Sequence, residues 1–188
     1  MKSFRLALVG ALALASLAMP SFAAEDNFLT IELKDGPVVI ELLADVAPKH
    51  VERLKELASN GEYDNVAFHR VIEGFMAQTG DVEFGDMEDG FEASRAGTGG
   101  SKLPDLPAEF SEVPFERGTV GMARSQDPDS ANSQFFIMFD EGSFLNGQYT
   151  VVGKVVSGME NIDKIKRGEG GNGEVSDPDR MVKVTVGK

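Results

Sequence analysis

The sequence predicts a mainly β protein in which short strands form a closed sheet accompanied by two α-helices. Three observations lead to this fold class. Short runs of apolar and β-branched residues recur along the chain, one helical pattern lies early, and another lies late. Many short strands with so few helices favour a sheet that closes on itself. With 188 residues, of which 41% are hydrophobic, the chain has the size and composition of one globular domain.

The first predicted element is a β-hairpin. Apolar and polar residues alternate over Phe28–Leu33, and a second apolar run covers Val38–Leu42. Between them stands Asp35-Gly36, a pair that favours a tight turn. Two such runs joined by a turn indicate two antiparallel strands.

A helix is predicted directly after the hairpin. Asp45 or a neighbour is the expected N-terminal cap, with Pro48 in the first turn. Asn60-Gly61 closes the pattern, as a left-handed C-terminal stop does. The apolar residues recur at helical spacing and are Val51, Leu54, Leu57 and Ala58.

The remaining elements are shorter, and a loop-rich stretch, Gly80–Pro114, divides them. A second helix is predicted at Met159–Lys166. The other strands are predicted from their β-branched and aromatic residues at Val66–Ile72, Phe75–Thr79, Thr119–Ala123, Gln134–Met138, Tyr149–Val155 and Met181–Val186.

The N-terminus has the layout of a secretory signal peptide. Lys2 and Arg5 form a basic start, Leu6–Met19 is an apolar run, and Ser21-Phe22-Ala23 offers a small-residue cleavage site. A membrane anchor is the alternative interpretation, but the apolar run is shorter than the roughly 20 residues that span a bilayer.

We therefore expect a signal peptide over residues 1–23, cleaved after Ala23, and one domain over residues 24–188. This layout is typical of bacterial export and predicts a periplasmic or secreted protein; a eukaryotic secretory route is the alternative. No membrane association is expected once the leader is cleaved, whereas an uncleaved leader would tether the chain.

The composition excludes several classes of partner. The net charge of −13 argues against nucleic acid or an anionic membrane surface. It favours basic or neutral polypeptides as partners. The chain contains no cysteine, which excludes disulfides and thiol chemistry.

One stretch, Phe68–Gln78, sets a single fixed cation among apolar side chains. Side chains of an extended segment alternate between its two faces. Arg70 is then expected at the rim of a pocket floored by Phe75 and Met76, with Gln78 beside it. Such a pocket suits an apolar group attached to an amide that needs polarising, for instance a prolyl peptide. An amphipathic strand with a surface arginine is the alternative.

Further motifs follow in a fixed order. They are Gly97-Thr98-Gly99-Gly100, Gly118–Arg124, Ser133–Ile137, Phe144–Gly147 and Val151–Val155, with Gly158-Met159 behind the last. Together with Phe68–Gln78, these motifs closely resemble the cyclophilin family of peptidyl-prolyl cis-trans isomerases. The resemblance runs from about Leu29 to Val186 and rests on several separated motifs rather than on one.

This resemblance implies a more specific fold and an activity. It implies a closed eight-stranded antiparallel β-barrel with a helix over each end, and an ordered surface loop rather than disorder at Gly80–Pro114. The implied activity is rotation about X–Pro peptide bonds, whose barrier is near 20 kcal/mol. No covalent bond breaks, so no nucleophile, metal or other cofactor is required. The implied partners are unfolded or flexible polypeptides that contain proline.

The resemblance also assigns roles to residues. Arg70 would stabilise the twisted prolyl amide, since a guanidinium stays charged and presents several donors in one plane. Gln78 and Phe75 complete the implied catalytic set. The implied substrate-binding residues are Met76, Gly97, Ala123, Arg124, Gln134, Phe136, Phe144, Leu145 and Tyr149.

Three positions depart from the commonest pattern of the family. Phe144 stands where many members have a tryptophan whose indole N–H binds cyclosporin, and phenylalanine cannot donate that bond. We therefore expect retained catalysis with weak cyclosporin binding. Tyr149 stands about where many members have a histidine. Thr79 replaces a frequent glycine, and nothing in the sequence explains it.

Other interpretations carry less weight. His50 and His69 are too far apart in the sequence to indicate a metal site; His50 is read as a solvated helix residue and His69 as a structural one. The acidic run Asp81–Glu92 is read as a solvated surface loop. A binding module with the same fold is the competing functional class, and Arg70 favours the enzyme because a scaffold does not require it. A monomer is expected, since catalysis needs only one groove.

Overall fold

The computed structural model describes residues 26–188. Within them, eight strands form one antiparallel sheet in the order β3-β4-β6-β5-β7-β2-β1-β8. The strands are β1 (Phe28–Leu33), β2 (Gly36–Leu42), β3 (Arg70–Ile72), β4 (Met76–Thr79), β5 (Thr119–Met122), β6 (Phe135–Met138), β7 (Val151–Ser157) and β8 (Lys183–Val186). The helices are α1 (Pro48–Ser59), the 3-10 helix η2 (Ser143–Leu145) and α2 (Met159–Ile162). The predicted leader, residues 1–23, lies outside the described residues.

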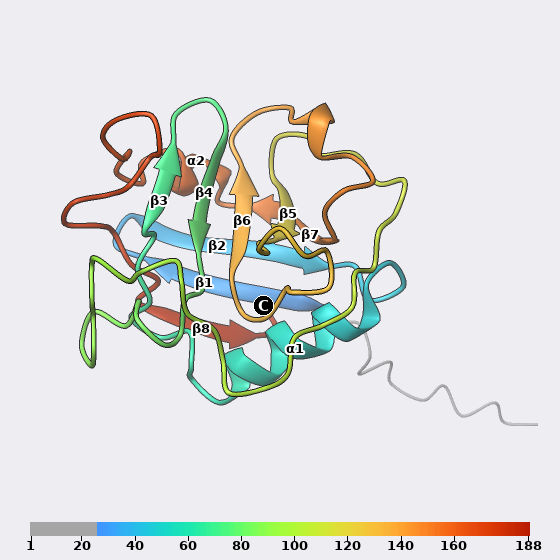
Figure 1. The fold of residues 1–188 in the computed structure, drawn as a ribbon, viewed down its shortest axis with the longest axis horizontal. Helices are drawn as coiled ribbons and strands as arrows, with labels where there is room; N and C mark the ends of the chain where they lie inside the picture. Colours follow the sequence, from blue (N-terminus) through green and yellow to red (C-terminus); the bar gives the residue numbers. More distant parts are fainter. Residues whose placement is uncertain (1–25) are drawn as a thin grey trace, which may run out of the picture.

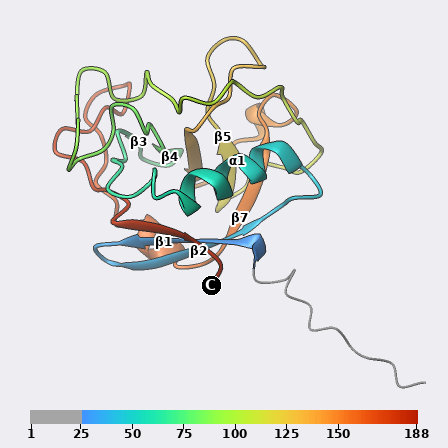
Figure 2. The same cartoon turned by 90° about the horizontal axis from the view of Figure 1, so that it is seen from below.

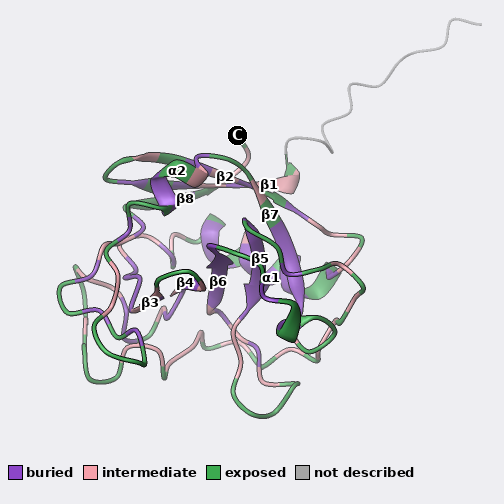
Figure 3. Ribbon diagram, turned by 90° about the horizontal axis from the view of Figure 1, so that it is seen from above, coloured by how far each residue is buried: buried purple, intermediate pink, exposed green. Residues whose placement is uncertain are grey.

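The sheet curls strongly on itself. β1, β2 and β8 cross beneath β3, β4, β6 and β5 (Figure 1). Seen from below, these two parts lie apart, with α1 in front of the space between them (Figure 2). All residues of β5 and β6 are buried, as are the first three of β7, whereas the loops carry most exposed residues (Figure 3). The mainly β class with two α-helices is therefore confirmed.

The predicted closure of the barrel is wrong, because the sheet is an open half-barrel with β3 and β8 as its edges. Only a single bridge, Ala67↔Arg180, links the segments that precede these edge strands. The amide of Ala67 donates to Gly85 O and that of Phe68 to Asp179 O. These bonds do not extend into a continuous ladder, and the strand predicted at Val66–Ile72 begins only at Arg70.

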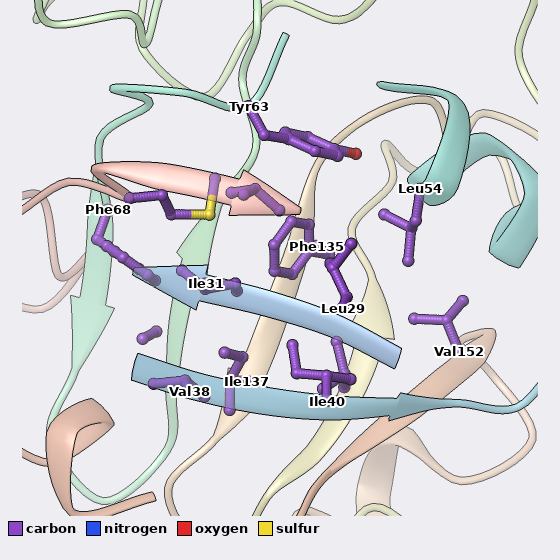
Figure 4. Packing of buried hydrophobic residues seen from close by; sticks show 14 of the residues in the cluster. Leu29, Ile31, Val38, Ile40, Leu54, Tyr63, Phe68, Phe135, Ile137 and Val152 are labelled. Atoms are coloured by element: carbon purple, nitrogen blue, oxygen red, sulfur yellow. The ribbon is translucent and has the colours of Figure 1, made fainter. Parts of the chain in front are cut away.

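The predicted hairpin is confirmed. β1 pairs with β2 in continuous antiparallel register from Phe28↔Glu41 to Leu33↔Gly36. Its alternation places Leu29 and Ile31 in the core, where they pack between the two parts of the sheet (Figure 4). Burial of such side chains is the main force that holds the curled sheet together.

Helix α1 is confirmed in extent, but its predicted cap is wrong. The N-terminal cap is Ala47, which makes no side-chain capping bond. Instead, the Glu109 carboxylate accepts hydrogen bonds from the amides of Lys49 and His50 at 3.1 Å. A residue distant in sequence therefore satisfies amides that would otherwise lack partners at a helix start.

The later elements match the predictions within a few residues. Helix α2 ends at Ile162 rather than Lys166, and β7 begins at Val151 rather than Tyr149. The stretch Gly80–Pro114 contains turns and isolated bridges but no strand. No helix among residues 26–188 is long and apolar enough to cross a membrane.

Candidate active site

The candidate site is built on the outer face of four neighbouring strands. Pairing register aligns Arg70 with Gln78, Gln78 with Phe136, and Phe136 with Gly121. These four residues form one row across β3, β4, β6 and β5. Their chain neighbours point the other way, so that Ile137, for example, belongs to the core. The alternation of strands thus separates one face for packing from one face for binding.

Gly121 leaves room for the floor of the site. A Cβ atom at this position would lie 2.6 Å from both the Phe115 and the Phe136 rings. Those rings stack with their centroids 5.7 Å apart. Phe136 is only 5% exposed and belongs to a second apolar cluster, separate from the main core. The absence of a side chain at position 121 therefore allows two aromatic rings to fill this part of the face.

An apolar cavity of about 400 Å³ lies above this floor. Met76 and Leu145 contribute buried walls, and Phe75 a half-buried one. Phe144 is 64% exposed and packs against Phe75 with ring centroids 5.4 Å apart. The cavity is lined by Arg70, Phe75, Met76, Gln78, Ala123, Arg124, Phe136, Phe144, Leu145, Gln148 and Tyr149. Its size and apolar lining suit a compact hydrophobic ring.

Arg70 is fixed at the rim of this cavity by two hydrogen bonds. Its Nε donates to Asn172 O at 2.9 Å and its Nη1 to Gln78 Oε1 at 3.2 Å. Burial lowers the pKa of Arg70, and the nearby Tyr149 acts in the opposite direction. An arginine side chain stays charged in proteins. The guanidinium therefore presents an oriented positive charge to the cavity.

A chain of amides extends from Arg70 along the groove. Gln78 Nε2 donates to Gln134 Oε1 at 2.9 Å, and Gln134 Nε2 donates to Gly99 O at 2.8 Å. Each amide thus uses one end to orient the next residue. The chain ends at the backbone of the glycine-rich loop.

A second cavity of about 260 Å³, lined mainly by polar and glycine residues, adjoins the first. The two cavities share Gln78, Ala123 and Arg124. Gly97 and Gln134 belong to the second cavity, as do Thr98, Gly99, Ser125, Ser130, Asn132 and Ser133. The structure therefore brings every predicted site residue into one continuous groove.

Asp81 organises the loop beside this second cavity. Its carboxylate accepts hydrogen bonds from the amides of Gly97 at 2.7 Å and Gly99 at 3.0 Å. Asp81 is fully buried, so the interpretation of the whole acidic run as solvated was wrong at this residue. Hydrogen bonds from these loop amides offset the free-energy cost of burying the Asp81 carboxylate.

Arg124 and Tyr149 form the side of the groove opposite β3 and β4. The Arg124 guanidinium lies 4.3 Å from the centre of the Tyr149 ring, and its Nη2 donates to Gln148 O at 2.8 Å. Tyr149 in turn packs edge-on against Phe136 at 5.9 Å. A cation over an aromatic face is held by the ring quadrupole.

The two histidines have structural surroundings. The prediction of a solvated His50 is wrong, because the residue is fully buried and its Nδ1 lies 2.7 Å from Glu109 Oε2. His69 is buried too, and burial lowers its pKa although Asp81 acts in the opposite direction. Its ring packs against Gly97, where a Cβ atom would lie 2.9 Å from His69 Cδ2. Within residues 26–188, no group of three or more metal-ligating side chains occurs.

Several residues that support the site were not predicted from the sequence. Phe115 and Gly121 build the floor, Asn172 holds Arg70 through its carbonyl, and Asp81 holds the loop. Phe115 and Asn172 lie outside the recognised motifs, and a backbone carbonyl leaves no trace in residue identity. Gly121 was inside a motif, but only the strand register shows what its missing side chain permits.

Comparison with known proteins shows the family of this chain. The family model described as "Cyclophilin type peptidyl-prolyl cis-trans isomerase/CLD" matches residues 28–186. A protein of Brucella suis named "Probable peptidyl-prolyl cis-trans isomerase" is 63% identical over 177 residues, which cover 94% of this chain and 90% of that protein.

Solved structures show the same architecture. A cyclophilin from Hirschia baltica superposes with a TM-score of 0.71 at 26% identity, covering 86% of this chain and 74% of that one. A cyclophilin-type isomerase of Cryptosporidium parvum, crystallised in the presence of the dipeptide Ala-Pro, gives 0.70 at 26% identity, with 86% and 99% covered. The chain described here belongs to the family of cyclophilin-type peptidyl-prolyl cis-trans isomerases.

Proposed function

We propose that this isomerase accelerates the folding of exported proteins by rotating their X–Pro bonds, with Arg70 stabilising the twisted prolyl amide. The observation that carries the proposal is the position of an oriented, charged guanidinium at the rim of an apolar cavity. The proline ring occupies this cavity between Met76, Phe136 and Leu145. The proposal does not require a cofactor.

The mechanism follows from the electronic change during rotation. A planar amide shares the nitrogen lone pair with its carbonyl, and twisting returns that pair to the nitrogen. The nitrogen then accepts a hydrogen bond that the planar form does not accept. A donor at Arg70 therefore binds the twisted state more strongly than either planar state, which is the requirement for catalysis.

The groove supplies the second requirement, which is to hold one side of the peptide while the other turns. Gln78 and Gln134 are oriented by their mutual hydrogen bond and offer polar contacts to the substrate backbone. The half-buried Phe75 and the exposed Phe144 close the apolar side of the cavity. Fixing the ring and one flank reduces the entropy lost on reaching the transition state.

The proposed location outside the cytoplasm rests on the N-terminal sequence. Lys2, Arg5 and the apolar run to Met19 have the pattern of a cleaved export signal. A periplasmic or secreted isomerase would act on chains that emerge unfolded from the export machinery. Fractionation of cells expressing the full chain tests this: processed protein in the periplasm is expected, and unprocessed protein in the cytoplasm would contradict it.

The proposed activity is tested by isomerisation of a short Ala-Pro-Phe-type peptide, followed in the presence of residues 24–188 and of their Arg70→Ala variant. We expect rapid isomerisation by the first protein and loss of most of the acceleration in the second. Undiminished catalysis by the variant would contradict the role of Arg70. No acceleration by either protein, with peptide binding retained, would instead indicate a binding module.

A further inference from the structure

We infer that the groove selects substrates with an acidic side chain close to the proline, and that Arg124 is the residue that determines this specificity. The inference rests on the proposed function and names its substrate class. Its basis is the charge of the groove, which is opposite in sign to the charge of the whole chain.

The groove contains two cations and no carboxylate. Among residues 26–188, the two cavities of the groove are lined by Arg70 and Arg124 but by neither aspartate nor glutamate. The complete chain nevertheless carries a net charge of −13. Such a local excess of positive charge in an acidic protein attracts anionic groups to the groove.

Neither arginine is neutralised by a partner. Within the described part of the chain, the ion pairs between side chains include neither Arg70 nor Arg124. Arg124 donates to the carbonyls of Ser125 at 2.9 Å and Gln148 at 2.8 Å. Carbonyls and the Tyr149 ring orient a guanidinium without cancelling its charge. Arg124 is therefore pre-organised to meet a carboxylate.

The acidic side chains nearest to Arg124 in the sequence, Asp127 and Asp129, do not line the two cavities of the groove. Asp127 accepts from the amide of Asp129 at 2.9 Å, and Asp129 accepts from the amide of Ala108 at 2.8 Å. Glu174 lines an adjoining cavity that shares Arg70, Gln78 and Gly97 with the groove but does not include Arg124. The end of the groove at Arg124 is thus the part where a substrate carboxylate meets the least competition.

The acidity of the whole chain does not cancel this local preference. At physiological ionic strength, charges more than about 8 Å away are largely screened. A substrate side chain inside the groove therefore interacts more strongly with the two arginines than with acids that lie beyond this distance. A lysine in the same place meets two like charges, so the groove disfavours basic flanks. The expectation of basic or neutral clients from net charge is thereby reversed for residues next to the proline.

The test compares peptides that carry Glu, Gln or Lys at one position flanking an Ala-Pro core. For the best position, kcat/KM of the Glu peptide is expected to exceed that of the Lys peptide about fivefold or more, the factor for an ion pair worth about 1 kcal/mol. The ratio should fall at high salt. Arg124→Gln should bring it close to one, whereas Arg124→Lys, which keeps the charge, should retain a preference for Glu.

Arg180→Gln is the matched control, because it removes the same charge from a residue that lines a different cavity. It should leave the ratio of the two peptides unchanged. An equal fall in Arg180→Gln would overturn the assignment to Arg124 in favour of net charge. A ratio near one in the unaltered protein, with the neutral peptide isomerised, would overturn the inference but leave the proposed function standing. No acceleration of any peptide would overturn the proposed function itself.

Discussion

Arg70 and Gln78 are cross-strand partners, and Arg70 Nη1 lies 3.2 Å from Gln78 Oε1. This bond joins the cation of β3 to the amide of β4 in front of the apolar cavity. Because Arg70 Nε is also engaged by Asn172 O, the plane of the guanidinium is fixed. A fixed donor has less freedom to lose when a transition state forms, which is what the proposed role of Arg70 requires.

Gln134→Leu should weaken catalysis although Gln134 is linked to Arg70 only through the Gln78 side chain. The variant removes the acceptor of Gln78 Nε2 and the donor to Gly99 O, so the Gln78 amide becomes free to rotate. We expect kcat/KM to fall about tenfold, as for other misplaced positioning groups. Gln126→Leu, in an exposed loop, is the control for loss of an amide. An unchanged rate for Gln134→Leu would refute the amide chain.

Phe136→Ala should destabilise the fold far more than Phe144→Ala. Phe136 is 5% exposed and stacks on Phe115, so its truncation leaves a cavity and should cost about 3 kcal/mol or more. Phe144 is 64% exposed, and its truncation should change stability by less than about 0.5 kcal/mol. Urea unfolding of both variants measures the difference. Similar losses would show that Phe136 does not form the floor.

Gly121→Ala should disturb the site through its floor. The added Cβ would lie 2.6 Å from Phe115 and Phe136, so the rings must move, at a cost of about 1–3 kcal/mol. KM for proline peptides should rise because the cavity loses its shape. Gly171→Ala is the control, since no atom lies within 4 Å of the added carbon there. Equal behaviour of the two variants would contradict this account of the floor.

Glu109 should make the stability of the fold depend on pH. Burial acts to raise the pKa of Glu109, but hydrogen bonds from the side chain and amide of His50 and from the amide of Lys49 bring the net pKa below its ordinary value. A depressed carboxyl pKa stabilises the fold above the unfolded pKa of roughly 4.3, and this contribution is lost as pH falls through the folded pKa.

Glu109→Gln should therefore cost about 1–2 kcal/mol at pH 7, the size of a lost cap with charge-assisted bonds. The gap between this variant and the unaltered protein should shrink when unfolding is measured well below pH 4. Glu52→Gln, exposed on the same helix, should have almost no effect at either pH. A gap that stays constant on acidification would contradict the proposed charged cap.

Phe144 should limit the affinity for cyclosporin, an expectation that comes from the family resemblance. Its ring is exposed and packs on Phe75, but it has no N–H or O–H group that could donate a hydrogen bond. Phe144→Trp should strengthen inhibition of the isomerase by about tenfold, the upper range for one added hydrogen bond. Nanomolar inhibition of the unaltered protein would contradict the expectation.

Local patterns predicted much of the fold because they report local physics. Alternation gave the strands of the hairpin, and Gly61 indicated the end of α1, where φ is +75°. The cap of α1 was missed because Glu109 arrives from a different part of the chain. The barrel was predicted to close because strand patterns do not show where pairing stops, and the segments before β3 and β8 share only the bridge Ala67↔Arg180 among the described residues.

The site was predictable to the extent that motifs carried it. Arg70, Gln78 and Phe136 were each identified from a motif, and their register then placed them in one row. The charge of the groove was not predictable, because net charge averages over the whole surface. Only the cavity lining shows that the acids of this chain lie elsewhere.

The central claim is that Arg70 acts on the twisted amide rather than on binding. NMR exchange measurements on a proline peptide separate Kd from the rate of isomerisation on the enzyme. For Arg70→Ala, we predict a Kd within about threefold of the original and an on-enzyme rate reduced about a hundredfold, as for loss of a transition-state donor. A large loss of affinity with an unchanged on-enzyme rate would contradict the account.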